Sequence, residues 1–501
     1  YFIKYPLVKN NQIPTANDQY IIVATTRPET MLGDAAVAVS PNDKRYKNLI
    51  GKKAFLPIQQ RDIPIIADEK VDMAFGTGAV KVTPAHSMDD FEISQRHNLQ
   101  VFEVVDKDGK MTKEAGPLCE GLKTSDCRLK VIEELQKQNL LVKTEDLAHN
   151  IGYCERCGTL IEPLYSKQWF LKMNELAELA KETVKSGAVK IHPKRWEGPY
   201  LAWLEKVRDW NISRQLWWGH KIPIQGEDDV LDTWFSSALW PFAVMGWPGS
   251  ENSASFGFSR LRRLAEFLLP GWPSKRDDYK NYYPTQFITS GRDILHLWIT
   301  RMIFSGIELT GKTPFKDVYI HATVLAKDGQ RMSKSKEIGV DPLELIEKYG
   351  ADALRFGLSF QATGVQDMRF NEDVIDAGRK FANKIWNAGR FVIMQLESGK
   401  EYEPKIPSGL DATDKEFIQE LNNLTKSTED NIQNFRFGQA ANDLYHFFWD
   451  RFAAVYLEDA KNKMNENKKA VLLYILASQL KLLHPFMPFI TEEIWSNLPL
   501  K

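Results

Sequence analysis

The spacing of apolar residues changes along the chain, and this change limits the folds that the chain can adopt. From residue 371 to 501, apolar residues recur every three to four positions, the spacing of helices that bury one face. Polar loops near Ser398 and Asn465 interrupt the pattern, so we predict a bundle of helices there. The residues that carry the spacing include Phe381, Ile385, Trp386, Phe391, Leu472, Ile475, Leu476 and Leu480.

Residues 1–148 show short apolar runs instead. Runs at 21–24, 35–39 and 79–82 have the length of strands and border polar or glycine-containing turns, so we predict one compact α+β domain. Residues 149–225 indicate a mixed connector with a helix at 173–186. Residues 226–370 alternate strand signals, at 287–290 and 318–325, with helix signals such as the one from Asp293. This alternation predicts a parallel α/β layer, so the predicted fold is multidomain α/β plus all-α.

One segment interrupts the α/β layer. Gly246-Trp247-Pro248 recurs as Gly271-Trp272-Pro273, and we predict that residues 249–273 are a surface insertion. A less favoured interpretation is a basic helix that contacts RNA, because three arginines lie between 260 and 263.

Composition restricts the function. The 501 residues suggest about three domains, and the net charge of -1 means that any RNA binding must come from local patches. Four cysteines fit a reducing compartment and argue against a disulfide scaffold. No apolar run approaches the roughly 18 residues of a membrane helix, and residues 1–7 do not resemble a signal peptide. We therefore expect a cytoplasmic protein with no membrane partner; because position 1 is Tyr, we expect a longer natural gene product.

A cationic loop follows the predicted strand at 318–325. It contains Arg331, Ser333, Lys334 and Ser335. When an adenylate forms, negative charge develops on the phosphates, and a flexible Lys with hydroxyls beside it can stabilise that charge. The same residues alone would also fit an ordinary solvated turn, so the surrounding sequence decides between the two.

The surrounding sequence resembles class I aminoacyl-tRNA synthetases. The loop is similar to their second signature, with Arg331 where the family usually has Lys, and the stretches at 341–342 and 349–355 also match, whereas 336–339 departs from the usual wording. The stretches at 213–220, 229–237, 364–370 and 381–387 look like the valyl-tRNA synthetase branch. The isoleucine branch is the less favoured alternative.

This resemblance implies a set of partners and sites. It implies ATP with Mg2+, valine and tRNA(Val) as partners of a monomer, in which residues 226–370 form the second half of a Rossmann-type catalytic domain and residues 371–501 bind the anticodon region. From side-chain spacing alone, the residues implied for valine binding could simply pack the core, and those implied for tRNA binding could simply form a solvated helix face. The implied residues are Arg331, Ser333, Lys334 and Ser335 for catalysis; Lys334, Gly291 and Asp293 for ATP; Trp234, Ile294 and Trp298 for valine; and Arg379, Lys380, Lys384 and Arg390 for tRNA.

The resemblance also implies an editing domain at residues 1–148. A hydrophobic valine pocket cannot strongly reject threonine, a limit already described for valyl-tRNA synthetases, and a second hydrolytic site is the remedy. In such a site an acid holds the substrate ammonium, cations orient the substrate or the RNA 3′ end, and hydroxyls contact water and the ester. The implied residues are Asp90 for the ammonium, Arg27 and Lys81 as the cations, Thr25 and Thr30 as the hydroxyls, and Phe75 in the second wall.

Two neighbours of Asp90 remain open. Ser87 stands where many relatives carry a second acid, so discrimination against threonine could be weaker or built differently. His86 is either a functional or a structural histidine, since no partner can be named from sequence.

Metal binding and completeness also remain open. Cys154 and Cys157 have the spacing of half a zinc site, and Cys119 and Cys127 do not complete it. None of the nine histidines lies in the His-x-Gly-His signature of the family, so we expect that this chain cannot aminoacylate alone. The alternatives are a protein that acts only as an aminoacyl-tRNA deacylase, and a non-catalytic tRNA-binding protein.

Overall fold

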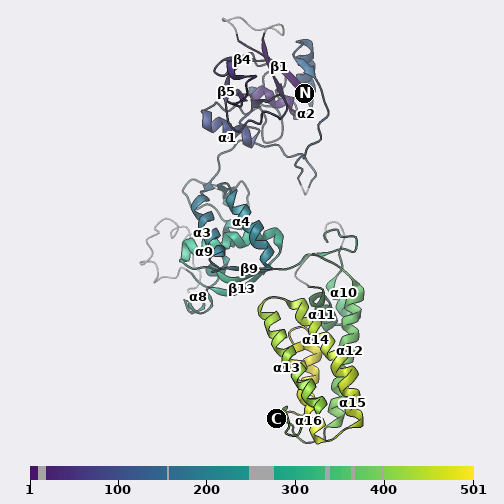
Figure 1. Ribbon diagram of the computed structural model, residues 1–501. Helices are drawn as coiled ribbons and strands as arrows, with labels where there is room; N and C mark the ends of the chain where they lie inside the picture. The colour runs from purple at the N-terminus through teal and green to yellow at the C-terminus, as the bar shows by residue number, and fades with distance from the viewer. Residues whose placement is uncertain (9–18, 155–156, 248–275, 333–338, 363–366, 398) are drawn as a thin grey trace. The chain divides into compact units, whose positions relative to one another are not determined.

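The computed structural model describes residues 1–8, 19–154, 157–247, 276–332, 339–362, 367–397 and 399–501. The chain divides into two compact units, Tyr1–Lys167 and Gln168–Lys501 (Figure 1). The predicted insertion at 249–273 lies outside the described residues. Within the described part of the chain, no helix combines the length and the apolar character that crossing a membrane requires.

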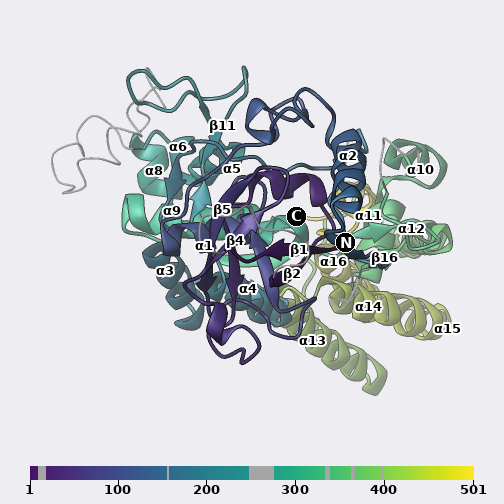
Figure 2. The same cartoon turned by 90° about the horizontal axis from the view of Figure 1, so that it is seen from above.

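The described residues of the first unit form two sheets, and Figure 2 shows β1 and β2 side by side. One sheet has the order β2-β1-β7, and the other has the order β4-β5-β3-β6, in which only β3 and β5 run parallel. All three predicted strands are confirmed, as β2, β3 and β6. The elements are β1 Phe2–Pro6, β2 Tyr20–Ala24, η1 Pro28–Gly33, β3 Ala36–Val39, η2 Lys47–Leu49, β4 Lys53–Leu56, β5 Arg61–Ala67, β6 Ala79–Val82, α1 Met88–His97, η3 Lys113–Ala115, α2 Thr124–Lys137 and β7 Leu141–Lys143.

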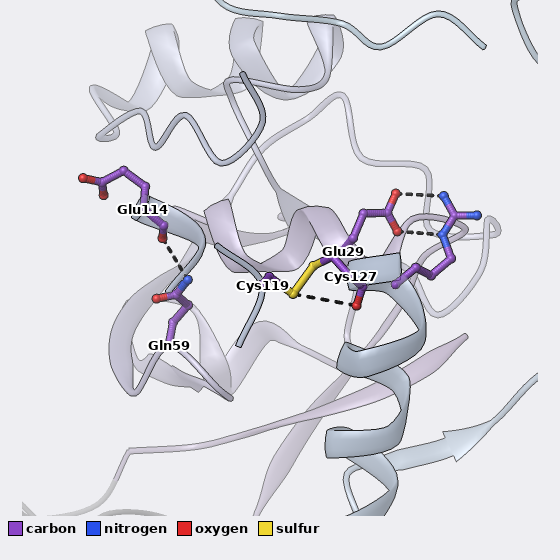
Figure 3. The surroundings of a disulfide bond; sticks show 6 residues. Glu29, Gln59, Glu114, Cys119 and Cys127 are labelled. Carbon is purple, nitrogen blue, oxygen red and sulfur yellow. Dashed lines mark hydrogen bonds and ion pairs between the residues drawn. A yellow bond between two sulfur atoms is a disulfide. The ribbon is translucent and has the colours of Figure 1, made fainter. Parts of the chain in front are cut away.

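Helix α2 packs its apolar face on this unit's core and carries a disulfide. Cys127, Val131 and Leu135 are fully buried, and Cys127 is bonded to the equally buried Cys119, with their Cα atoms 5.2 Å apart (Figure 3). Close by, the Gln59 amide donates a hydrogen bond of 3.0 Å to the Glu114 carbonyl. The count of four cysteines did not predict this disulfide.

The second unit begins with a parallel α/β layer. Its sheet has the order β13-β14-β9, so it includes a strand from the predicted connector, and Ile288 and Ile191 pair with Val318 on its two sides. The elements up to residue 310 are β8 Phe170–Leu171, α3 Asn174–Lys185, β9 Lys190–His192, η4 Lys194–Trp196, α4 Glu197–Glu205, β10 Trp210–Asn211, β11 Ser213–Arg214, β12 Val230–Leu231, α5 Thr233–Ala238, α6 Trp240–Ala243, α8 Arg276–Tyr282, β13 Thr285–Ser290, η6 Arg292–Ile294, η7 Leu295–Ile299 and α9 Thr300–Thr310.

Two expectations for this layer need correction. The predicted strand at 318–325 is two strands, β14 Phe315–Ile320 and β15 Val324–Leu325, because β15 leaves the main sheet and pairs with β16 Met368–Arg369. The predicted helix from Asp293 starts as the 3-10 turn η6 and the π-helical turn η7 before the regular helix α9.

Residues 371–501 are helical, as predicted, and α11 (Ala351–Gln361), which lies in the predicted α/β layer, packs against α12 and α14 of this bundle. Figure 1 shows α11 beside α12, and α13 beside α14. Phe381, Ile385 and Leu472 are fully buried, whereas Trp386 is 40% exposed, because it faces away from the apolar side of α12. The helices are α10 Pro342–Tyr349, α11 Ala351–Gln361, α12 Glu372–Gln395, α13 Ala412–Gln433, α14 Phe437–His446, η9 Phe447–Tyr456, α15 Leu457–Asn462, α16 Glu466–Leu483 and α17 Pro488–Ser496.

Candidate hydrolytic and adenylate sites

Lys81 lies at the centre of a buried polar cluster in the first unit. Strand β6 places it inside the domain, where the residue is 8% exposed. Its ammonium donates to Thr83 Oγ1 at 2.6 Å, Thr30 Oγ1 at 2.9 Å and Asp34 Oδ1 at 3.2 Å. An ammonium has three hydrogens, so this network satisfies them all. Lys81 therefore orients two hydroxyl groups.

Asp34 is a member of this cluster that sequence reasoning missed. Its Oδ1 accepts from Thr83 Oγ1 at 2.6 Å, and its Oδ2 accepts from the Tyr5 hydroxyl at 2.7 Å. Burial raises the pKa of Asp34 above its ordinary value, and the charge of Lys81 opposes that shift. The sequence contained a signal for this role, because Asp34 directly precedes the apolar run at 35–39. An acid that is buried together with such a run needs a charged or hydrogen-bonding partner.

Asp90 adjoins the cluster from helix α1. Its Oδ2 accepts the Thr83 backbone N–H at 2.8 Å, and burial raises the pKa of Asp90 while the charge of Lys81 lowers it. Ser87 is the N-cap of α1, and its hydroxyl oxygen accepts from the Asp90 N–H at 3.3 Å. Ser87 therefore has a local role that fits its residue type.

Arg27 and the threonines lie on the turn between β2 and η1. The Arg27 side chain donates to the His86 carbonyl at 3.3 Å, and its backbone N–H donates to Thr25 Oγ1 at 3.0 Å. Thr30 donates to the Arg27 carbonyl at 2.9 Å, so its hydroxyl joins this turn to Lys81. Thr25, Arg27, Thr30, Lys81 and Asp90 are thus linked through neighbouring contacts.

Phe75 stands at the edge of this arrangement. It is 67% exposed, on a loop with positive φ angles at Gly76 and Gly78. A Cβ at Gly76 would lie 3.3 Å from the Cβ of Ala24, so the loop crosses the end of β2, one residue before Thr25.

His86 is a structural histidine. Its Nε2 accepts the Val104 N–H at 3.0 Å, which leaves the proton on Nδ1 to donate to the Pro163 carbonyl at 3.2 Å. Burial lowers the pKa of His86 to about 4, so the ring is neutral near pH 7. The two backbone partners answer the question that the sequence left open.

Of the residues predicted for ATP binding and catalysis, Gly291 and Asp293 follow the carboxyl end of β13, and Arg331 forms a bridge with Leu325 of β15. Asp293 forms an ion pair with Arg331, with 2.7 Å between Oδ2 and Nη2. The hydrogen bond from the Arg331 guanidinium lowers the pKa of the Asp293 carboxyl. A Cβ at Gly291 would lie 2.6 Å from Asp293 Oδ1, so Gly291 makes room for that carboxylate. Ligands of parallel sheets bind at the carboxyl ends of strands, which fits this position. Ser333, Lys334 and Ser335 lie outside the described residues.

Sequence reasoning missed the arginines around this edge. Arg195, Arg292 and Arg369 line a cavity of about 510 Å³ next to Leu325, and Arg292 is paired with Asp367 at 2.7 Å. The sequence could have indicated Arg292, because it lies between Gly291 and Asp293, which were both predicted for ATP binding.

The structure brings together two of the three residues predicted to bind valine. Trp234 and Trp298 pack on one core cluster, and Trp298 donates from Nε1 to the Ser237 carbonyl at 3.2 Å. Ile294 ends the 3-10 turn η6 and Trp298 lies in the π-helical turn η7, so the two residues are not on one regular α-helix. Asp232 caps the helix of Trp234 and is ion-paired with Arg214 at 3.0 Å and Arg301 at 3.3 Å.

The zinc expectation receives no support. Cys154 and Cys157 are free thiols, and no group of three or more His, Cys, Asp or Glu residues that could hold a metal occurs among the described residues. A hydrogen bond with Thr159 lowers the pKa of Cys157 to about 7.

The four predicted tRNA-binding cations all lie on α12. Arg379 and Lys380 share Asp376 as an ion-pair partner, at 2.8 and 2.9 Å. Lys384 stands 5.3 Å from the ring centre of Trp449, and Arg390 is exposed.

Comparison with known proteins identifies the family. Residues 81–228, 224–261 and 264–371 match the family of tRNA synthetases class I (I, L, M and V), and residues 414–500 match the anticodon-binding domain of tRNA ligase. The chain therefore belongs to the class I tRNA synthetases.

Individual relatives show which members of this family the chain resembles. Valine–tRNA ligase of Thermotoga maritima is 43% identical over the whole chain, and that of Geobacillus stearothermophilus is 45% identical; the chain spans 57% and 56% of their lengths. Methionyl-tRNA synthetase of Mycobacterium tuberculosis shares the fold, with a TM-score of 0.52 at 17% identity over 70% of this chain and 66% of that chain.

Proposed function

We propose that the chain is the editing, adenylate-loop and anticodon-binding part of a valine–tRNA ligase, and that its first unit hydrolyses threonyl-tRNA(Val). The whole ligase would form valyl-adenylate from valine and ATP with Mg2+, and then transfer valine to tRNA(Val). The similarity to valine–tRNA ligases supports the substrate. The observation that carries the hydrolytic proposal is the buried cluster in which Lys81 fixes the hydroxyls of Thr30 and Thr83 beside Asp90.

In this proposal Asp90 receives the ammonium of the mischarged threonine. Its Oδ2 is occupied by the Thr83 N–H, so Oδ1 is the atom that accepts from the substrate. Thr30 and Thr25 contact the ester and the attacking water, while Lys81 holds Thr30 in place. Arg27 contacts the RNA 3′ end, and Phe75 belongs to the second wall of the site.

The test is hydrolysis of threonyl-tRNA(Val), with valyl-tRNA(Val) for comparison. Asp90→Asn keeps a hydrogen-bond acceptor for Thr83 but removes the charge, so hydrolysis should fall at least 100-fold. Asp89→Asn, one position earlier on the same helix, is the matched control and should change hydrolysis less than threefold. Unchanged hydrolysis in Asp90→Asn would overturn the assignment.

The adenylate half has a separate test. The chain contains no His-x-Gly-His signature, so valine-dependent exchange of pyrophosphate into ATP should be undetectable while threonyl-tRNA hydrolysis persists. Exchange by this chain would contradict that expectation. Absence of both activities, with tRNA binding intact, would favour the non-catalytic alternative.

We also propose that Arg379, Lys380, Lys384 and Arg390 bind tRNA phosphates. Replacing Arg390 with Gln should weaken tRNA binding more at low salt than at high salt, because phosphate contacts release counterions. An unchanged salt dependence would argue that this face is only solvated.

A further inference from the structure

Arg27 lies between two carboxylates of the first unit. Its Nε is 3.5 Å from Glu29 Oε1, and its Nη2 is paired with Glu162. The Glu29 side chain is fully buried, although it belongs to the short turn η1 that also carries Thr30. A buried carboxylate needs charged partners, so whatever holds Glu29 also fixes the position of Arg27 and Thr30.

Helix α2 holds both of these acids from its first turns. Arg128 donates from Nε and Nη2 to the two oxygens of Glu29, each at 2.8 Å, a bidentate pair. Thr124 donates to Glu162 Oε1 at 3.3 Å. Bidentate Arg–carboxylate pairs fix orientation as well as charge. The start of α2 therefore supplies a partner to each acid that flanks Arg27.

The start of α2 is itself anchored. Cys127, the neighbour of Arg128, is fully buried and bonded to Cys119 on the preceding loop (Figure 3). Figure 3 shows Glu29 close to this disulfide, with both of its oxygens in contact with a guanidinium group. The backbone that carries Arg128 is thus restrained on its buried side.

We infer that Arg128 is a positioning residue of the hydrolytic site: through Glu29 it fixes the turn that presents Arg27 and Thr30. This inference rests on the proposed hydrolysis of threonyl-tRNA. Arg128 acts through Glu29, so its effect should appear in kcat, which depends on the placement of Thr30. The effect on KM should be smaller, because Asp90 keeps its contact with Thr83 and Arg27 keeps its contacts with Glu162 and the His86 carbonyl.

The experiment compares Arg128→Gln, Glu29→Gln and the double variant. Arg128→Gln removes the bidentate partner of the buried Glu29 carboxylate, so kcat for threonyl-tRNA hydrolysis should fall at least tenfold with KM changed less than threefold. The double variant removes both charges and should recover thermal stability without recovering kcat. If kcat recovers together with stability, the pair is merely structural and the inference is wrong.

Arg96→Gln is the matched control. Arg96 also makes a bidentate pair with a buried acid, Asp68, at 3.0 Å for both contacts, but it lies in the last turn of α1. Its loss should lower stability and change kcat less than threefold. An equal kcat loss in both variants would overturn the inference.

Hydrogen exchange separates this inference from the proposed function. The Thr30 amide donates to the Arg27 carbonyl at 3.1 Å within η1. Its exchange should accelerate at least tenfold in Arg128→Gln and remain unchanged in Arg96→Gln. A wild-type chain without hydrolytic activity sinks the proposed function, whereas unchanged exchange in Arg128→Gln sinks the inference alone.

Discussion

In each unit a buried lysine lies in a polar network, and the two networks differ. Lys81 in the first unit is 8% exposed, and Lys468 in the helical bundle is 2% exposed. Lys468 contacts two carboxylates, those of Asp414 and Asp411, the latter at 3.0 Å. Lys81 contacts one carboxylate and two hydroxyls.

The partners explain what each lysine does. Asp411 is the N-cap of α13, and Asp414 completes its capping box, so Lys468 joins the start of one helix to α16. The partners of Lys81 are Thr83, which directly follows β6, and Thr30 and Asp34, which belong to η1 and its C-cap; they lie next to Asp90. A lysine held by helix caps stabilises the fold, whereas a lysine held by hydroxyls orients groups that can contact a ligand.

The largest expected effect is that of Lys81→Met. It leaves Asp34 buried without its cation and releases Thr30, so hydrolysis of threonyl-tRNA should fall at least 100-fold, with stability lowered by about 3–5 kcal/mol. Hydrolysis and urea unfolding of the same preparation provide the measurement. Hydrolysis within threefold of wild type in folded Lys81→Met would break the distinction between the two lysines.

Lys468→Met should lower stability by about 3–5 kcal/mol and leave hydrolysis unchanged. Burial opposes charge on Lys468, but hydrogen bonds with Asp414 and Asp411 outweigh it and raise the pKa of this lysine. The contribution is therefore complete below the ordinary lysine value of about 10.5 and is lost as pH rises through the folded value. Urea unfolding at alkaline pH should show this loss in wild type and not in the variant. Reduced hydrolysis in the variant would contradict a purely structural role.

The first unit should instead lose stability in acid, through His86. Burial lowers the pKa of His86 to about 4, so its contribution is complete above the ordinary value of 6.5 and disappears as pH falls toward 4. The change amounts to about 3 kcal/mol. Unfolding between pH 6.5 and 4 should show this loss in wild type, and His86→Gln should remove it.

Two acids of the same unit act in the opposite direction. Burial raises the pKa of Asp34 and Asp90, so protonation of these groups favours the folded state as pH falls. The comparison of wild type with His86→Gln isolates the histidine because both proteins contain these acids. Parallel pH profiles for the two proteins would refute the prediction.

How much of the fold and of the candidate site could be predicted depends on how far apart in the sequence the contacting residues lie. The strands at β2, β3 and β6 and the bundle follow local patterns, and motifs placed Lys81, Arg27 and Asp90 in one domain. Local patterns do not show that Lys81 saturates its donors internally, because Thr30 lies 51 residues away. They also missed the Arg128–Glu29 pair, separated by 99 residues, because a surface arginine on a helix is the default expectation.

Tyr5→Phe should have the smallest effect, and it refines the comparison. Tyr5 donates at 2.7 Å to the one oxygen of Asp34 that Lys81 does not use. Its loss leaves a buried carboxylate oxygen without that donor and should cost about 1–3 kcal/mol in urea unfolding. Hydrolysis should stay within threefold of wild type, because Lys81 still holds Thr30 and Thr83. If Tyr5→Phe reduces hydrolysis as strongly as Lys81→Met, Asp34 and Tyr5 belong to the site itself, and the hydroxyls alone do not distinguish Lys81 from Lys468.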